Sequence, residues 1–153
     1  RPMIRNKLQL IPMVCCLCLA ILACAACEKE DDIDEIFTGK TWYMNGGIIS
    51  GKKLNSDIQN FYTDAKTDAY YITFSSQTFK GMLTNGDSFS GTWSANGKKQ
   101  TIKLKLTETP AASTPFDKQI YYILAGATSY RSGADFLQLR KDGDNVLYLG
   151  NRR

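Results

Sequence analysis

The chain has 153 residues and a formal net charge of +4 at pH 7, a length that allows one domain with a core of its own. It contains no histidine, which excludes Ser-His-Asp and Cys-His catalysis, Cys/His zinc sites and a histidine pH switch. All five cysteines lie in the first 27 residues, so the remainder of the chain cannot form an internal disulfide.

The start of the chain has the composition of a leader. Three basic residues precede an uncharged run from Leu10 to Ala26, which ends in small residues. A positively charged segment, then an apolar segment, then small residues at a cleavage site are typical of a secretory signal peptide. The alternative is a transmembrane helix, but such a helix needs about 20 apolar residues, and Pro12 interrupts this run. We therefore expect residues 1–26 to be a signal peptide.

The sequence CAAC at residues 24–27 resembles a bacterial lipobox, in which an aliphatic and two small residues precede the cysteine that receives the lipid. Cys27 follows Ala25 and Ala26, and the polar chain begins directly after it. The resemblance implies that Cys27 is the lipid anchor, and several acyl chains on one cysteine make membrane attachment stable. Two alternatives stay open: lipidation at Cys24, or a free thiol in an uncleaved leader.

An acidic segment follows this cysteine, with six acids and one lysine in residues 28–35. Its residues Lys29, Glu30, Asp31 and Asp32 resemble the lysine-plus-acids export signal of surface lipoproteins in the Bacteroidota. That resemblance implies an outer-membrane lipoprotein displayed at the cell surface. The alternative is a self-repelling charged stalk on a lipoprotein that faces the periplasm. We expect residues 27–35 to be a lipidated acidic tether.

Residues 36–153 are expected to form a single, mainly β domain. The segment KTWYM, from Lys40, predicts a first strand, followed by a glycine-broken loop through Lys53. Alternation of apolar and polar residues then predicts four strands, in AYYITF, TFKGML, SFSGTW and TIKLKL. Asn96-Gly97 predicts a two-residue type I′ turn between the last two strands, and residues 84–87 predict another turn. Such turns produce an antiparallel meander.

Helices are expected at three places. A helical turn at 33–39 would end at Gly39, and Ser56 with Gln59 forms a capping box for a helix over 57–67. Thr114 as N-cap and Pro115 predict a helix over 116–125, although its β-branched and aromatic residues would also suit a strand. The segments DFLQL and NVLYL predict a terminal hairpin.

The tryptophan-bearing first strand, the hairpin SFSGTWSANGKKQTIKL, one late helix and the terminal DGDNVLYL hairpin resemble small lipocalin-like or META-type (HslJ-like) domains. Such domains recur in Bacteroidota lipoproteins of unknown function. The resemblance implies an α+β, mainly β fold, in which an antiparallel meander curls into a sheet or partial barrel with two helices. It brings no catalytic residues to this chain.

Five aromatic residues are candidate ligand contacts, with burial in the core as the alternative: Trp42, Tyr70, Tyr71, Trp93 and Tyr121. Asp57, Asp64 and Asp68 would share a helix face, either as paired carboxylates or as a solvated surface. Residues 142–145 hold oxygens that suit calcium, but they lack the rest of a ligand loop and predict a turn. We expect no metal, cofactor or nucleic-acid partner.

The sequence therefore predicts a membrane-anchored, non-catalytic envelope module that binds an unknown protein or small molecule. One alternative is an inhibitor of lytic enzymes. The other is a carboxylate-dependent enzyme that acts on glycans through residues such as Asp57 and Asp64.

Overall fold

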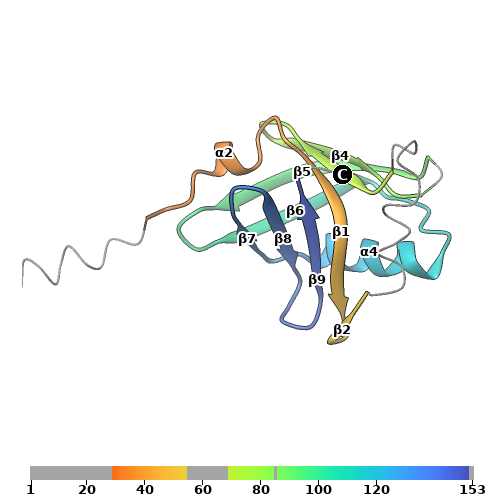
Figure 1. Ribbon diagram of the computed structural model, residues 1–153. Coiled ribbons are helices and arrows are strands. Elements are labelled where there is room, and N and C mark those ends of the chain that lie inside the picture. Colours follow the sequence, from red (N-terminus) through yellow and green to blue (C-terminus); the bar gives the residue numbers. More distant parts are fainter. Residues whose placement is uncertain (1–28, 55–68, 85, 152–153) are drawn as a thin grey trace, which may run out of the picture. The chain divides into compact units, whose positions relative to one another are not determined.

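A computed structural model describes residues 29–54, 69–84 and 86–151. The chain divides into two compact units, Arg1–Glu30 and Asp31–Arg153, and the second contains the helices and strands described below (Figure 1). The expected helix over 57–67, with Asp57, Asp64 and Asp68, lies outside the described residues.

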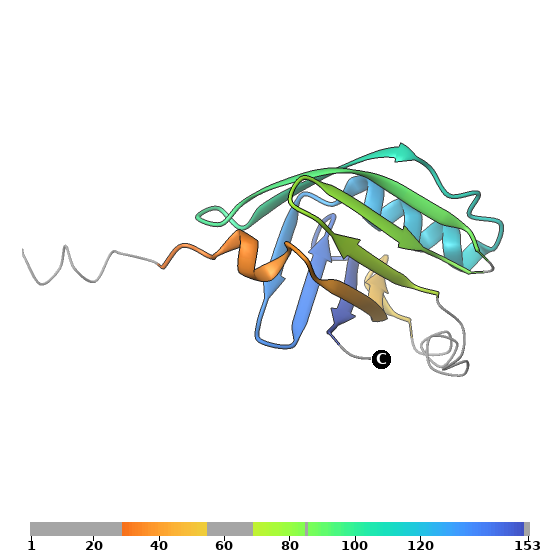
Figure 2. The same ribbon diagram turned by 90° about the horizontal axis from the view of Figure 1, so that it is seen from above.

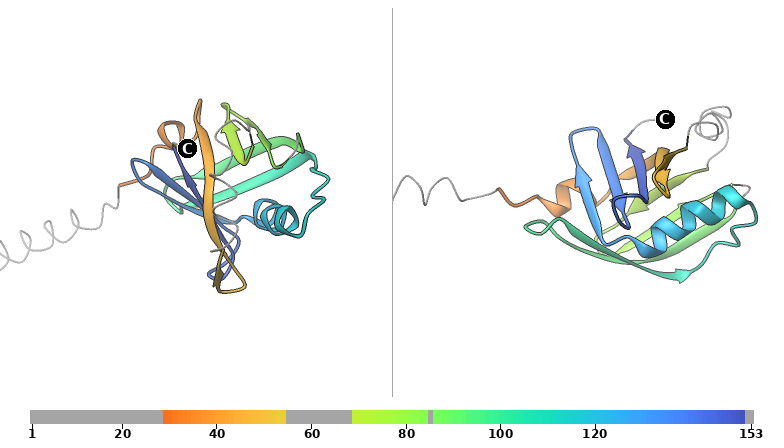
Figure 3. Two further views of the ribbon diagram at one scale, coloured as in Figure 1. Left: turned by 45° about the vertical axis from the view of Figure 1, so that its right-hand side comes forward. Right: turned by 90° about the horizontal axis from the view of Figure 1, so that it is seen from below.

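The second unit is built on one antiparallel sheet. Each strand from β3 onward pairs with the next, and β1 pairs with β2, β3 and β9, which brings the two ends of the meander together (Figure 3). The predicted mainly β fold with a curled meander is confirmed, and the curl is a near-ring. The strands are β1 (Thr41–Ile49), β2 (Lys52–Lys53), β3 (Tyr71–Phe74), β4 (Thr78–Met82), β5 (Ser88–Asn96), β6 (Thr101–Glu108), β7 (Ser129–Ser132), β8 (Phe136–Arg140) and β9 (Val146–Gly150).

Strand β1 joins the two ends of the sheet because its halves have different partners. Tyr43 pairs with Tyr71 of β3 and with Gly150 of β9, and the register with β9 shifts between Met44 and Gly46. The predicted loop over the glycines is wrong, since β1 continues to Ile49. A Cβ atom at Gly47 would lie 2.6 Å from the carbonyl oxygen of Val146. The glycine therefore permits the close approach of β9 and does not break the strand.

The turn between β5 and β6 also differs from its prediction. Asn96 pairs with Thr101, so the connection has four residues, 97–100, instead of the two of a type I′ turn. The Asn96 side-chain oxygen accepts a hydrogen bond from the backbone N–H of Lys99 at 2.9 Å. The residue with positive φ is Gln100, at 53°. Asn96 thus shapes this turn through its side chain and not through a left-handed backbone.

The late helix is confirmed as α4 (Pro115–Gly126), and the strand alternative is wrong. The backbone N–H of Asp117 donates to the Thr114 hydroxyl at 3.0 Å, as the capping pattern predicted. Strands β6 and β7 share a single residue pair, and α4, which connects them, packs on β6, β8 and β9. Figure 2 shows α4 lying alongside the long β5–β6 hairpin. The helix buries Ile120, Ile123 and Leu124 where strand pairing is short.

A second helix, α2 (Ile33–Ile36), packs against the interior of the sheet through the residue that follows it. Phe37 is fully buried, and its ring centroid lies 5.0 Å from that of Phe74 and 5.0 Å from that of Trp93. Gly39, with φ of 75°, then turns the chain toward β1. The interior is filled by apolar side chains, among them Trp42, Ile72, Phe89, Leu104, Tyr130, Leu139 and Leu149.

Candidate functional site

The end of the acidic segment is part of the folded unit. The Oδ2 atom of Asp31 accepts hydrogen bonds from the Tyr130 hydroxyl at 2.9 Å and from the Gln100 side-chain amide at 3.1 Å. Asp32 is the N-cap of α2, and its Oδ1 atom accepts from the backbone N–H of Glu35 at 3.1 Å. Of the residues that resemble an export signal, Asp31 and Asp32 therefore have structural contacts.

The remaining candidate residues of this region are Lys29, Glu30 and Cys27. Lys29 and Glu30 are exposed, while Cys27 lies outside the described residues. The described part of the chain contains no helix that is long and apolar enough to span a membrane.

The candidate ligand-contact aromatics do not gather at one site. Trp42 and Trp93 are buried, and their indole N–H groups donate to the carbonyl oxygens of Ile36 at 3.1 Å and Ser75 at 2.8 Å. They belong to the core because each ring is covered and each indole N–H has a protein acceptor.

The three tyrosines occupy other positions. Tyr71 is half-buried, with its ring centroid 6.5 Å from that of Tyr43, and Tyr121 is half-buried on α4. Tyr70 packs edge-on against Phe116 at 5.6 Å and takes part in a polar cluster.

That polar cluster surrounds the one charged side chain that is buried in the described part of the chain. Asp117 is only 2% exposed. The Tyr70 hydroxyl donates to its Oδ1 atom at 2.8 Å and also shares a hydrogen bond with the Thr84 hydroxyl. Burial raises the pKa of the Asp117 carboxyl, and the hydrogen bond from Tyr70 opposes part of that shift. Tyr70 has φ of 53°, a left-handed conformation that costs an aromatic residue about 1–3 kcal/mol.

Asp87 completes this cluster from the turn between β4 and β5. Its two carboxylate oxygens accept from the backbone N–H groups of Ala111 at 2.7 Å and Ala112 at 2.9 Å. The charge of Asp87 further raises the pKa of Asp117. In the described residues every buried side-chain nitrogen and oxygen has a hydrogen-bond partner. The cluster thus fastens loop 109–114 to the sheet, and the Asp117 carboxylate faces protein groups instead of solvent.

Sequence reasoning missed this cluster. Asp117 lies in the first turn of the predicted late helix and had no other signal in the sequence, and its partner Tyr70 lies 47 positions earlier. Thr84 and Asp87 appeared only as turn residues.

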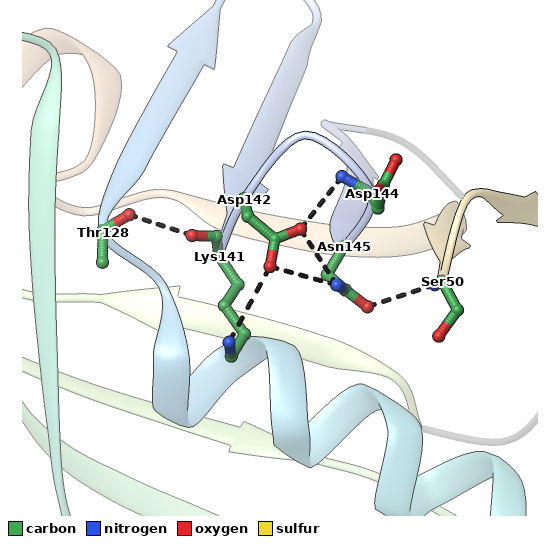
Figure 4. A network of polar contacts seen from close by, with 6 residues as sticks. All are labelled: Ser50, Thr128, Lys141, Asp142, Asp144 and Asn145. Carbon is green, nitrogen blue, oxygen red and sulfur yellow. Dashed lines mark hydrogen bonds and ion pairs between the residues drawn. The ribbon is translucent and has the colours of Figure 1, made fainter.

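The loop between β8 and β9 forms a second polar network (Figure 4). Asp142 accepts from the backbone N–H of Asp144 and from the Asn145 amide, both at 2.9 Å. Asn145 in turn accepts from the Ser50 backbone N–H at 3.2 Å, which links this loop to the β1–β2 turn. The hydrogen bond from Asn145 lowers the pKa of Asp142.

The same loop contacts α4 through Lys141. Its Nζ atom lies 4.7 Å from the centroid of the Tyr122 ring and 3.8 Å from Asp142. The contact with Tyr122 raises the pKa of Lys141. The oxygens considered for calcium are therefore used within the turn. The described residues contain no group of three or more acidic, cysteine or histidine side chains that could hold a metal ion.

A shallow hollow of about 410 Å³ lies beside α2. Its lining combines hydroxyl groups, one amide and one carboxylate with apolar side chains, and no observation assigns it a ligand. Its lining residues are Ile33, Asp34, Ser76, Gln77, Thr92, Trp93, Ser94 and Ala95.

Comparison with known proteins places this fold in a family. A crystal structure of a DUF4847 family protein from Bacteroides vulgatus ATCC 8482, at 1.00 Å resolution, is similar at a TM-score of 0.63 and 25% sequence identity. The similarity covers 79% of this chain and 98% of that one. No curated protein matches the chain. A family model described as a domain of unknown function, DUF4847, matches residues 28–152. The chain therefore belongs to the DUF4847 family.

Proposed function

We propose that this chain is an outer-membrane lipoprotein, anchored through Cys27, whose β domain is a non-catalytic binding module for a macromolecular partner. The anchor is supported by the leader and by the lipobox-like CAAC sequence. The likeness to lipocalin-like and META-type lipoprotein domains agrees with such a module, and it assigns no ligand.

The apolar core that the described side chains form inside the near-ring is the observation that supports this binding mode. A ring of about eight strands has room inside for its own side chains or for one small ligand. Here Phe37 and Trp93 are in contact within the interior, and α4 covers the side where β6 and β7 separate. A partner would therefore bind the outer surface or the loops, which favours a macromolecule over a small molecule held inside.

Lipid labelling tests the anchor. Cys27→Ala should abolish incorporation of a labelled fatty acid and leave the unprocessed chain in the membrane fraction. Cys24→Ala is the matched control, because it changes the neighbouring thiol and should leave labelling intact. Labelling that survives in Cys27→Ala and disappears in Cys24→Ala would move the anchor to Cys24.

Protease treatment of intact cells tests surface display. We expect a cell-surface protein to be cleaved while periplasmic controls survive. Lys29→Ala with Glu30→Ala should reduce this cleavage, since both side chains are exposed and the exchange leaves the contacts of Asp31 and Asp32 in place. Full protection until the outer membrane is opened would instead place the domain in the periplasm.

The loop of residues 109–114 supports a second candidate, an inhibitor of lytic enzymes. Asp87 holds Ala111 and Ala112 through their backbone N–H groups, and Ser113 next to them is exposed. A rigid exposed loop is preorganised for insertion into another protein's cleft. The purified protein should then slow lysozymes or proteases at micromolar concentration, and Asp87→Ala should weaken that effect.

The remaining alternative is a carboxylate-dependent, glycan-acting enzyme. A broad hydrolase screen tests it, since activity lost in Asp57→Ala or Asp64→Ala would overturn the non-catalytic proposal.

A further inference from the structure

The proposed anchor is covalently close to one end of the β domain. Asp31 is held at the turn of residues 97–100, because its backbone N–H donates to the Gly97 carbonyl at 3.3 Å and its carboxylate accepts from Gln100 at 3.1 Å. Four peptide links separate Asp31 from Cys27. A fully extended chain covers at most about 3.6 Å per residue, so the two residues can be no more than about 14 Å apart.

We infer that the turn of residues 97–100 faces the membrane and lies against the lipid headgroups, while the opposite ends of β5 and β6 face away from it. This inference rests on the proposed lipidation of Cys27. The interaction surface is the tip of the β5–β6 hairpin, and its partner is the phospholipid headgroup layer.

Strand length excludes the inverted orientation. Strand β5 runs from Ser88 to Asn96, and at about 3.3 Å per residue its ends are roughly 26 Å apart. With the Ser88 end against the membrane, Asp31 would be about that far from the surface, which is beyond the reach of four residues. The hairpin tip can face away only if the Asp31 contacts break.

The exposed charges distinguish a domain whose hairpin tip faces the membrane from one whose α2 side lies flat on it. Lys98 and Lys99 are exposed on the turn and supply ammonium groups to lipid phosphates. Asp34 and Glu35 are exposed on the neighbouring helix α2. Their charge opposes placing the α2 side flat on an anionic membrane. The acids of the tether beside the turn offset Lys98 and Lys99, so the length of the tether decides which end of the hairpin lies at the membrane.

This orientation presents the other end of the hairpin to the surroundings. The turn that contains Asp87 and the loop of residues 109–114 lie at that end, fastened to each other by the Asp87 carboxylate. A macromolecular partner would meet these loops first.

Quenching of a protein-bound fluorophore by nitroxide groups on the lipid headgroups tests the orientation. The full chain is expressed in a bacterium that removes the leader and acylates Cys27. All native cysteines lie in the first 27 residues, so Lys99→Cys and Ser113→Cys each provide one free thiol in the processed chain. Each is labelled with a fluorophore and reconstituted into phosphatidylethanolamine–phosphatidylglycerol vesicles that carry a headgroup nitroxide. We expect several-fold stronger quenching at position 99 than at position 113. Equal quenching, or stronger quenching at position 113, would overturn the inference.

A linker variant tests whether the short tether is the cause. Insertion of about 20 Gly/Ser residues between Glu30 and Asp31 preserves the cysteine and allows the domain to tumble, so the difference between the two positions should shrink. A difference that persists in this variant overturns the tether explanation.

Mass spectrometry of the same samples separates this inference from the proposed function. Acylated Cys27 with the wrong quenching pattern overturns the orientation alone. Absence of acyl chains, with no flotation of the protein with vesicles, overturns the anchor and the orientation together.

Discussion

The Tyr130 hydroxyl donates a 2.9 Å hydrogen bond to the Asp31 carboxylate, across 99 positions of the chain. Tyr130 is buried in β7, and its ring lies 5.2 Å from that of Phe37. The contact therefore connects the first residue of the folded unit to the aromatic core. It makes the acidic segment a structural element from Asp31 onward.

Removing this hydroxyl should weaken the fold measurably. We expect Tyr130→Phe to lower the free energy of unfolding by about 1.5–3 kcal/mol, the range for a hydrogen bond to a charged group. Urea denaturation measures the change. Tyr148→Phe is the matched control, since the Tyr148 hydroxyl has no hydrogen bond within the described part of the chain, and it should leave stability unchanged. An additive double variant of Tyr130→Phe with Asp31→Asn would contradict direct coupling.

Asp117 should make stability depend on pH. Its folded-state pKa is raised above the ordinary value of 3.8, so the folded state binds this proton more tightly than the unfolded state. The stabilising contribution of the protonated form is present below pH 3.8 and is lost as pH rises through the folded-state pKa. The Asp117→Asn variant has no carboxyl group at this position, so it does not lose stability in this way. The free energy of unfolding of the variant, relative to that of the natural protein, should therefore increase toward neutral pH. Denaturation midpoints across that range measure the effect, and parallel profiles would contradict it.

The two tryptophans should behave as core residues. We expect blue-shifted fluorescence that iodide quenches weakly, because Trp42 and Trp93 are 2% and 9% exposed. Trp93→Ala should cost about 3–5 kcal/mol in unfolding free energy, as large aromatic truncations do. Trp93→Phe is the milder comparison, since it keeps a ring near Phe37 but removes the hydrogen bond to Ser75. Unchanged stability of the Trp93→Ala variant would contradict the core role.

Gly91 should tolerate no side chain. A Cβ atom there would lie 2.0 Å from the carbonyl oxygen of Lys105 on the paired strand β6. We expect Gly91→Ala to cost about 1–3 kcal/mol or more in unfolding free energy, because the clash is with backbone. Gly143→Ala is the control, since no heavy atom beyond its two chain neighbours lies within 4 Å of its Cβ position, and its effect should stay below about 0.5 kcal/mol. Thermal unfolding of both variants makes the comparison, and equal losses would contradict the clash.

Local patterns in the sequence were sufficient for most of the secondary structure. Ile102 and Leu104 alternate with Lys103 and Lys105, and β6 buries the first pair and exposes the second. Thr114 caps α4 as its position predicted. These predictions succeeded because strand alternation and helix capping depend on residues within a few positions of one another.

By itself the sequence determined the strand faces of the meander and the late helix, and it motivates the proposed anchor. Only the tertiary structure decided how the sheet closes, where Asp31 is fastened and which groups surround Asp117. Pairing of β1 with β9 and the contact between Tyr70 and Asp117 join segments far apart in the chain. Such contacts leave no periodic signal in sequence, because they depend on how folded elements pack and on which polar groups that packing buries together.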